Sequence, residues 1–204
     1  MSRVRLRVIG FVMAAVWLIP NGNAQTSTTF SGSDGTYRFS YPSDFQICTK
    51  GNVEPCLQTY IPICSKDALV CAVYPAGEFK GTNFSGASFE VRVIVRDIRY
   101  GDMTADKCVT PTADESFLIS AEHPTEMIGG VRFIHGSYGA ELMSQWYEGD
   151  LYRAFHDGQC FELILSKAGI NPDGGSEIKM LTPTQEKKID QAMSQILHSF
   201  RFTN

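Results

Sequence analysis

Six cysteines are the residues of this chain with the clearest chemical potential. Four of them fall within one short stretch, CTKGNVEPCLQTYIPICSKDALVC, which runs from Cys48 to Cys71. Zinc sites usually contain close pairs such as C-x2-C, because two ligands must reach one ion from one turn. The spacings here are C-x7-C-x7-C-x6-C, with long gaps to Cys108 and Cys160, and no C-x-x-C redox pair occurs. The spacing therefore favours disulfide bonds over a metal site or a thiol redox centre.

Fifteen pairings of six cysteines exist, and the sequence alone does not choose among them. The segments TKGNVEP and SKDALV each separate two consecutive cysteines and can reverse the chain within a short loop. On that basis we expect three disulfide bonds: Cys48–Cys56, Cys64–Cys71 and Cys108–Cys160. Their role would be structural, so full reduction should destabilise the protein rather than switch an activity.

The four histidines do not show the spacing of a metal site. None stands at i, i+4 with another ligand on a predicted helix, and no H-x-H pair occurs; the four are His123, His135, His156 and His198. The loop NPDGGSE, from Asn171 to Glu177, carries oxygen-bearing side chains but lacks the alternating carboxylates of a calcium loop. We expect neither a metal ion nor another cofactor.

A serine in the segment HGSYG, from His135 to Gly139, comes closest to a nucleophile motif. The motif G-x-S-x-G requires glycine where His135 stands, and it requires a strand, a turn and a helix, whereas more strand is expected after this segment. A catalytic role is therefore disfavoured. The alternative that stays open is a secreted hydrolase with a dispersed site made of Ser137, His135 and Asp157.

Aromatic side chains are the remaining candidates for a functional site. Most aromatic residues of a strand-rich segment pack in the core, but a few on an open sheet face can form a binding surface. The candidate binding residues are close in sequence: Trp146, Tyr147, Tyr152 and Phe155.

The N-terminal residues predict export. Three arginines among the first seven residues precede the uncharged apolar run Val8–Pro20, and Gly22 and Ala24 stand at the −3 and −1 positions of a cleavage site. This pattern is typical of a secretory signal peptide of residues 1–24. A retained anchor is disfavoured, because the apolar run is shorter than the roughly 20 residues that span a bilayer. We expect a secreted or periplasmic bacterial protein without a stable membrane span after cleavage.

The charge of the chain limits its partners. It carries 18 Lys and Arg against 22 Asp and Glu, a net charge of −4, and loss of the signal peptide would remove three arginines. Such a surface gives no electrostatic reason to bind nucleic acid. A hydrophobic content of 43% indicates a folded body. The expected partner is an envelope protein or a small ligand of unknown identity.

Residues 25–35, QTSTTFSGSDG, are rich in Ser, Thr and Gly and predict a flexible leader, followed by a single domain of residues 36–204. Within the domain, TYRFSY alternates as a half-buried strand does, and SFEVRVIVR predicts a second strand with Phe89, Val91, Val93 and Val95 on one face. Glu148-Gly149-Asp150 predicts a turn between LMSQWY and LYRAF.

Asp157-Gly158 is a strong hairpin signal, because a type I′ turn needs positive φ at both central positions. A turn of two residues places Arg153 opposite Glu162 and Phe155 opposite Cys160. We interpret Arg153 and Glu162 as a solvated pair across the two strands, and we expect the other face of the hairpin to be core.

A C-terminal helix is predicted with a capping box. Thr182 is the N-cap, Pro183 occupies the first turn, and Gln185 completes the box. The apolar residues repeat at helical spacing and should face the core; they are Ile189, Met193, Ile196, Leu197 and Phe200.

Three short motifs resemble PsbP/DcrB-like domains. YRFSYPSDF (Tyr37–Phe45) resembles their opening strand, ILHSFRF (Ile196–Phe202) resembles their closing helix, and IGG at Ile128–Gly130 is similar to the glycine pair before a middle strand. The three cysteine pairs and the segment Tyr60–Pro75 depart from the better-known members and look more like uncharacterised exported bacterial proteins with extra cysteines.

The resemblance implies an α+β fold, an α/β/α sandwich with a mainly antiparallel central sheet and a long C-terminal helix. Members of the family are mostly binding or assembly proteins without catalysis, so the fold licenses no specific activity. We therefore expect a non-enzymatic, disulfide-stabilised domain that binds a protein or small ligand in the cell envelope. The secreted hydrolase is the alternative.

Overall fold

A computed structural model describes residues 26–52, 56, 63–95, 102–110, 124–142, 144–172 and 177–203. The predicted signal peptide of residues 1–24 lies outside this part of the chain. None of the helices in the described ranges is both long and apolar enough to cross a membrane.

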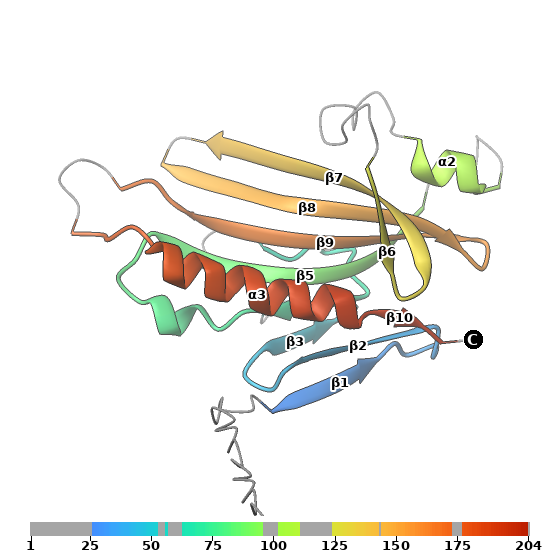
Figure 1. The fold of residues 1–204 in the computed structure, drawn as a ribbon, viewed down its shortest axis with the longest axis horizontal. Helices are drawn as coiled ribbons and strands as arrows, with labels where there is room; N and C mark the ends of the chain where they lie inside the picture. The colour runs from blue at the N-terminus through green and yellow to red at the C-terminus, as the bar shows by residue number, and fades with distance from the viewer. Residues whose placement is uncertain are drawn as a thin grey trace, which may run out of the picture.

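Two antiparallel sheets and three helical segments make up the described structure (Figure 1). The small sheet has the order β1 (Ser27–Ser31), β2 (Tyr37–Pro42), β10 (Arg201–Phe202). The large sheet has the order β3 (Gln46–Thr49), β4 (Val70–Val73), β5 (Phe84–Ile94), β9 (Gln159–Ile170), β8 (Gln145–His156), β7 (Val131–Leu142), β6 (Thr125–Ile128). The helical segments are η1 (Ala76–Phe79), α2 (Ala105–Val109) and α3 (Pro183–Ser199).

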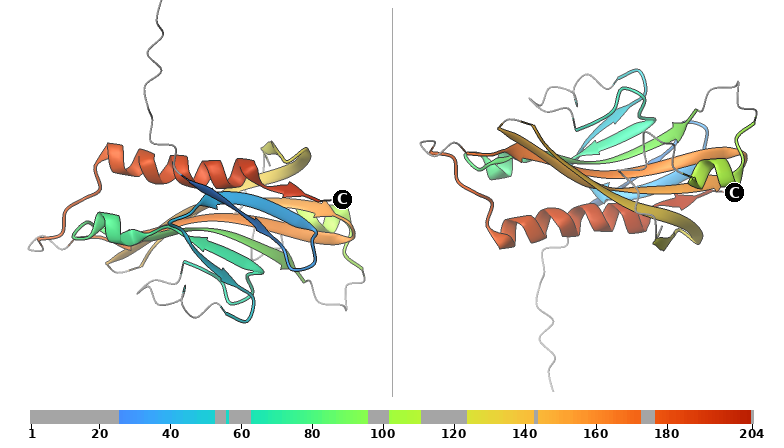
Figure 2. Two further views of the ribbon diagram at one scale, coloured as in Figure 1. Left: turned by 90° about the horizontal axis from the view of Figure 1, so that it is seen from below. Right: turned by 90° about the horizontal axis from the view of Figure 1, so that it is seen from above.

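The predicted fold class is confirmed. All strand pairs of both sheets are antiparallel, and α3 lies across one face of the large sheet (Figure 2). On the opposite face, Val109 of α2 packs against Ile134 of β7 and Leu151 of β8. The large sheet is therefore the middle layer between a long helix and a short one.

The main core lies between α3, the small sheet and one face of the large sheet. Phe39 of β2 meets Phe89 of β5 edge-to-face at 5.0 Å between ring centroids, and Tyr37 stacks on Phe200 at 5.7 Å. The predicted capping box of α3 is present, with Thr182 and Gln185 bonded reciprocally, and the apolar residues expected to face the core are buried. Local signals thus positioned α3 correctly, because both the cap and the stripe lie within one segment.

The flexible leader predicted for residues 25–35 is wrong for its central part. Ser27–Ser31 form β1 and pair with β2 along their whole length. The ring of Phe30 packs 5.3 Å from that of Phe39, its partner across the strands. Threonine and aromatic residues favour strands, and this aromatic pair outweighs the flexible composition around it.

The turn predicted at Glu148-Gly149-Asp150 is also wrong, because β8 continues through it. A Cβ atom on Gly149 would lie 2.7 Å from the Tyr138 hydroxyl oxygen and 2.0 Å from the Leu165 carbonyl oxygen. Gly149 is therefore the place where Tyr138 crosses β8 to bond Ser166, with 2.7 Å between the two hydroxyl oxygens. The missing side chain of Gly149 lets Tyr138 lie close to the backbone of β8, and it does not mark a turn.

The hairpin of β8 and β9 has the predicted register, with Arg153 opposite Glu162 and Phe155 opposite Cys160. Its turn residues, Asp157 and Gly158, have φ values of 47° and 78°. The predicted solvation of the ion pair is wrong, because Arg153 is 1% exposed and Glu162 is 0% exposed.

Glu162 lies between two guanidinium groups. Arg153 Nε donates to Glu162 Oε1 at 2.6 Å, and Arg92 of β5 pairs with the second carboxylate oxygen, Oε2. The bond between Cys108 and Cys160 fixes α2 on the same face of the sheet. Part of this face is thus covered by α2, which is distant in the sequence. The sequence of the hairpin alone therefore could not indicate that the face is covered.

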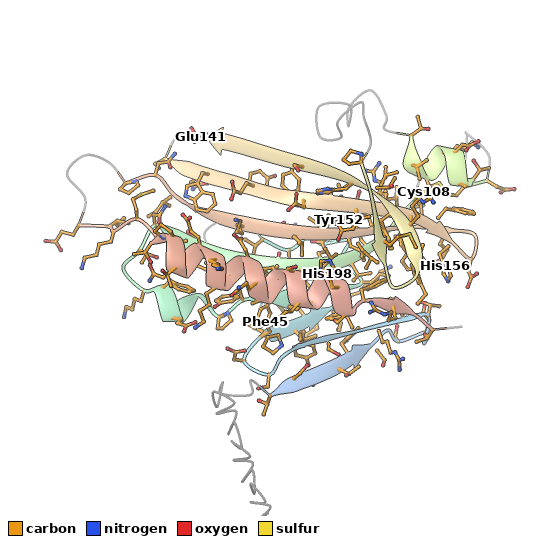
Figure 3. The ribbon with its side chains drawn as sticks, viewed as in Figure 1. Phe45, Cys108, Glu141, Tyr152, His156 and His198 are labelled. Atoms are coloured by element: carbon orange, nitrogen blue, oxygen red, sulfur yellow. A yellow bond between two sulfur atoms is a disulfide. The ribbon has the colours of Figure 1, made fainter. Side chains whose placement is uncertain are left out.

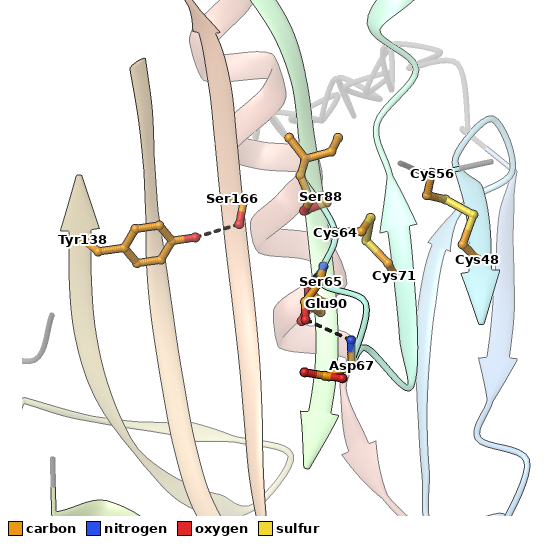
Figure 4. Close-up of a disulfide and its surroundings, with 11 residues drawn as sticks. Cys48, Cys56, Cys64, Ser65, Asp67, Cys71, Ser88, Glu90, Tyr138 and Ser166 are labelled. Carbon is orange, nitrogen blue, oxygen red and sulfur yellow. Dashed lines mark hydrogen bonds between the residues drawn. A yellow bond between two sulfur atoms is a disulfide. The ribbon is translucent and has the colours of Figure 1, made fainter. Parts of the chain in front are cut away.

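The three expected disulfide bonds are confirmed: Cys48–Cys56, Cys64–Cys71 and Cys108–Cys160. The two local bonds meet side by side, because Cys48 of β3 is the direct partner of Cys71 of β4 (Figure 4). The Ser65 N–H next to Cys64 donates to Glu90 Oε2 on β5 at 2.8 Å. This hydrogen bond connects the segment that carries the two local disulfide bonds to the middle of the sheet.

Glu90 makes the stability of this region dependent on pH. It is buried, its Oε1 atom has no hydrogen-bond partner among the described residues, and burial raises its pKa above the ordinary value of 4.5 despite the opposing Ser65 N–H and Arg92. A carboxyl group with a raised pKa holds its proton more tightly in the folded state. Its contribution to stability is therefore fully present below about pH 4.5 and is lost as the pH rises through the folded-state pKa.

Replacing Glu90 with glutamine should raise the free energy of unfolding relative to the wild type above the folded-state pKa, and the gain should shrink toward pH 4. Urea unfolding at a series of pH values measures both curves. Glu141→Gln removes an exposed carboxylate and is the control, with a curve that stays parallel to that of the wild type. Parallel curves for Glu90→Gln and the wild type would contradict the prediction.

Candidate functional site

A groove of about 360 Å³ opens between α3 and the large sheet. Tyr152 of β8, Leu165 of β9, and Met193 and Leu197 of α3 contribute apolar surface to it. Strand residues two apart share a face, and helix residues three or four apart share a stripe, so both elements present these side chains to the same space. The groove lies at the side of the main core, where α3 leaves part of the sheet uncovered (Figure 3).

Tyr152 is the aromatic wall of the groove. It is almost fully buried, and burial raises the pKa of its hydroxyl above the ordinary value of 10.0. The ring of His135 on β7 lies parallel to it, at 4.5 Å between ring centroids and an interplanar angle of 2°. The two stacked rings give this side of the groove a flat and rigid surface.

Two side chains of β7 form hydrogen bonds with the Asp150 carboxylate. His135 Nε2 lies 2.9 Å from Asp150 Oδ1, and the hydroxyl of Ser137 donates to the same oxygen at 3.0 Å. A hydrolytic triad requires histidine between serine and the carboxylate. Here the carboxylate lies between serine and histidine, and no hydrogen bond joins Ser137 to His135, both of which the structure describes.

The structure does not bring Asp157 to the other two residues of the alternative hydrolase site. Asp157 lies in the turn after β8 and pairs with its neighbour His156 at 3.4 Å. Among the described residues, Ser137 therefore has no histidine positioned to take its proton, and its hydroxyl bonds the Asp150 carboxylate instead.

Acidic groups form the rim of the groove. Lys167 Nζ lies 2.9 Å from Glu148 Oε1 and 2.9 Å from Asp190 Oδ1. Partial burial lowers the pKa of Lys167, but the bonds to Asp190 and Glu148 outweigh this effect and raise it above 10.5. Lysine thus stays charged, and its charge is matched by two carboxylates.

The rim keeps an excess of negative charge after this pairing. Asp150 and Glu126 add two carboxylates, whose ion pairs among the described residues are with His135 and His198, with 3.0 Å between Glu126 Oε1 and His198 Nε2. The side chains of Asp190 and Asp150 are 55% and 42% exposed, so both keep oxygen surface for a further donor. Apolar walls under an acidic rim can hold a positively charged group that carries an apolar portion.

The four predicted binding aromatics do not form one surface. Trp146 and Tyr152 lie on the α3 side of β8, whereas Tyr147 and Phe155 alternate to the opposite side. Only Tyr152 lines the groove, and Trp146 covers Gly169, where a Cβ atom would lie 2.5 Å from the indole ring. The lysine and aspartate residues of the groove were not selected from the sequence, because such residues look like ordinary surface charges in a sequence.

No group of three or more His, Cys, Asp and Glu side chains within the described ranges is arranged to hold a metal ion.

No protein-family model and no curated protein sequence matches the chain. Its fold is similar to several solved structures, each at 11% sequence identity. A protein of Bacteroides thetaiotaomicron has a TM-score of 0.48 over 86% of this chain and 48% of its own, so this chain spans about half its length. LpqN, involved in cell envelope biogenesis of Mycobacterium tuberculosis, has a TM-score of 0.43 over 88% and 91% of the two chains. The PsbP protein CyanoP of Synechocystis sp. has a TM-score of 0.42 over 89% and 96%.

Proposed function

We propose that this protein is an exported, disulfide-stabilised binding domain of the cell envelope, and that its groove beside α3 holds a small organic cation. The observation that carries the proposal is a groove with mixed apolar and polar walls whose rim has more carboxylates than cations. A volume of about 360 Å³ falls within the range of small-molecule sites, roughly 300–1,000 Å³. Three disulfide bonds support a location outside the reducing cytosol.

The proposed ligand is an ammonium compound with a short apolar tail. Its tail would lie against Tyr152, Met193 and Leu197, which removes apolar surface from water. Its positive head would lie at the rim, where Asp190 and Asp150 have exposed oxygen atoms. An anion of the same size would meet the excess carboxylates and would be repelled.

Hexyltrimethylammonium is the probe, and hexanoate is its counterpart of opposite charge. We expect saturable amide shifts at Lys167, Asp190 and Ser194 when labelled protein is titrated with hexyltrimethylammonium and followed by NMR, and none with hexanoate. Ser194→Lys places a positive charge on the groove wall and should weaken binding roughly tenfold, because like charges within a few ångströms repel.

Gln195→Lys is the matched control. Gln195 is the next residue of α3, is exposed like Ser194, and does not line the groove, so this variant should bind the probe as the wild type does. The proposal fails if hexyltrimethylammonium does not bind, if hexanoate binds equally well, or if the two lysine variants weaken binding to the same extent.

A further inference from the structure

The outer edge of β7 is only partly paired. β6 covers Val131–Ile134, and the His135 N–H donates to the Pro124 carbonyl at 2.7 Å just beyond it. β7 then continues to Leu142 along the margin of the sheet (Figure 1). Backbone groups alternate between the two sides of a strand, so the N–H and C=O groups of residues 137, 139 and 141 point away from β8 as those of His135 do.

No hydrogen bond between described residues reaches these outward backbone groups. A row of unpaired N–H and C=O groups is a template for another strand, and proteins usually protect such an edge with charges, proline or bulges. The segment Gly136–Leu142 has no proline and one charged side chain, Glu141. Within the described ranges, the edge is therefore open to pairing by an extended segment.

The side chains next to this edge indicate the charge of its partner. Gly139 has no side chain, and the nearest atom to a Cβ there would be the Tyr147 carbonyl oxygen at 3.8 Å. The space that this leaves is a hollow of about 300 Å³ whose wall includes Glu141, Glu148 and Trp146. The Glu141 carboxylate beside an indole ring can hold a lysine or arginine side chain by charge pairing and by a cation–π contact. Glu148, which also contacts Lys167 at 2.9 Å, adds a second carboxylate to this wall.

We propose that the free part of β7 binds an extended, basic segment of a partner protein by strand addition, with a lysine or arginine in the hollow at Gly139. This site shares Glu148 with the rim of the groove beside α3, but the strand addition does not require a ligand in that groove. A second copy of this chain is the less favourable occupant, because a pair of β7 edges would place two acidic surfaces next to each other.

A short labelled peptide in which lysine alternates with valine is the probe, and fluorescence anisotropy measures its binding. We expect it to bind more weakly as salt increases, and we expect the same peptide with glutamate in place of lysine not to bind. Two N-methylated versions test the backbone pairing, one for each set of alternate residues. One should lose affinity roughly tenfold or more and the other should not, because only one set of N–H groups faces β7.

Gly139→Pro and Gly139→Ala test the protein side. Proline removes the outward N–H and should weaken the lysine peptide roughly tenfold, whereas alanine keeps the N–H and should retain binding. Thermal unfolding checks that both variants fold, and the N-methylated pair decides the matter if the proline variant does not. Ser194→Lys should leave peptide binding unchanged, so failure of the groove proposal and failure of this one can be told apart.

Four results of the peptide experiments would each overturn the inference. These are a lysine peptide that does not bind, a glutamate peptide that binds equally well, a folded Gly139→Pro variant that binds as the wild type does, and full affinity of both N-methylated peptides. Sedimentation that shows a dimer abolished by Gly139→Pro would overturn it as well, in favour of a second copy at this edge.

Discussion

Replacing Glu162 with glutamine is expected to lower the free energy of unfolding by about 3–5 kcal/mol. Glu162 is fully buried and is the shared carboxylate of Arg92 and Arg153. Glutamine keeps the shape of the side chain but leaves Arg153, which is equally buried, without the charge that faces it at 2.6 Å. A buried guanidinium that loses its carboxylate keeps the cost of its desolvation. Urea unfolding at neutral pH measures the change.

Glu148→Gln is the matched control on the adjacent strand. Glu148 also pairs with a basic residue, Lys167 at 2.9 Å, but its side chain is 55% exposed. Ion pairs in contact with solvent contribute at most about 1 kcal/mol, so this variant should unfold close to the wild-type midpoint. Equal losses for the two glutamine variants would show that burial does not set the strength of the Glu162 contacts.

The ion pair illustrates what the sequence can and cannot predict. The register of Arg153 and Glu162 follows from the Asp157-Gly158 turn, which is a local signal. On the same face, α2 contacts β8 and is tied to β9 by the bond between Cys108 and Cys160. Polar residues at alternate positions look solvated unless the segment that covers them is known.

The groove, too, could be predicted from the sequence only in part. Tyr152 could be selected because aromatic residues cluster in the segment that forms β8. Lys167 and Asp190 meet only when α3 packs on β9, and a charged residue on an exposed helix position gives no sign of its partner across the fold. Of the small sheet, β2 was predicted, but β1 was missed for a related reason, since its contact with Phe39 stabilises a segment whose composition suggests flexibility.

The two faces of the large sheet differ in what they can do. On the α2 face, Tyr138 bonds Ser166 across Gly149, and Glu162 bonds two arginines, so these polar groups are bonded within the fold, whereas Glu90 Oε1 has no partner among the described residues. On the α3 face, carboxylates of the groove rim keep exposed oxygen atoms. Fully paired polar networks rigidify a sheet, whereas partly paired groups at a surface are available to a ligand. The binding proposals therefore concern the α3 face and the edge beside it.

Removing the bond between Cys108 and Cys160 by a double serine substitution is expected to cost about 4 kcal/mol of stability. The two cysteines are 52 residues apart, whereas those of the other bonds are 8 and 7 apart. A bond that closes a longer loop removes more conformational entropy from the unfolded chain. The same substitution of Cys48 and Cys56 should cost about 2.5 kcal/mol. Urea unfolding of both double variants under non-reducing conditions tests this order, and an equal or reversed order would contradict it.

The long bond also connects to the buried ion pair. Cys160 is two residues from Glu162, and the bond holds α2 over the face on which Arg153 and Glu162 are buried. If α2 detaches in the double serine variant, water reaches both charges, and an ion pair in water is worth little. The cost of Glu162→Gln should therefore fall from about 3–5 kcal/mol toward 1 kcal/mol in that background. A double-mutant cycle measures this coupling, and strictly additive losses would show that α2 stays in place without its disulfide bond.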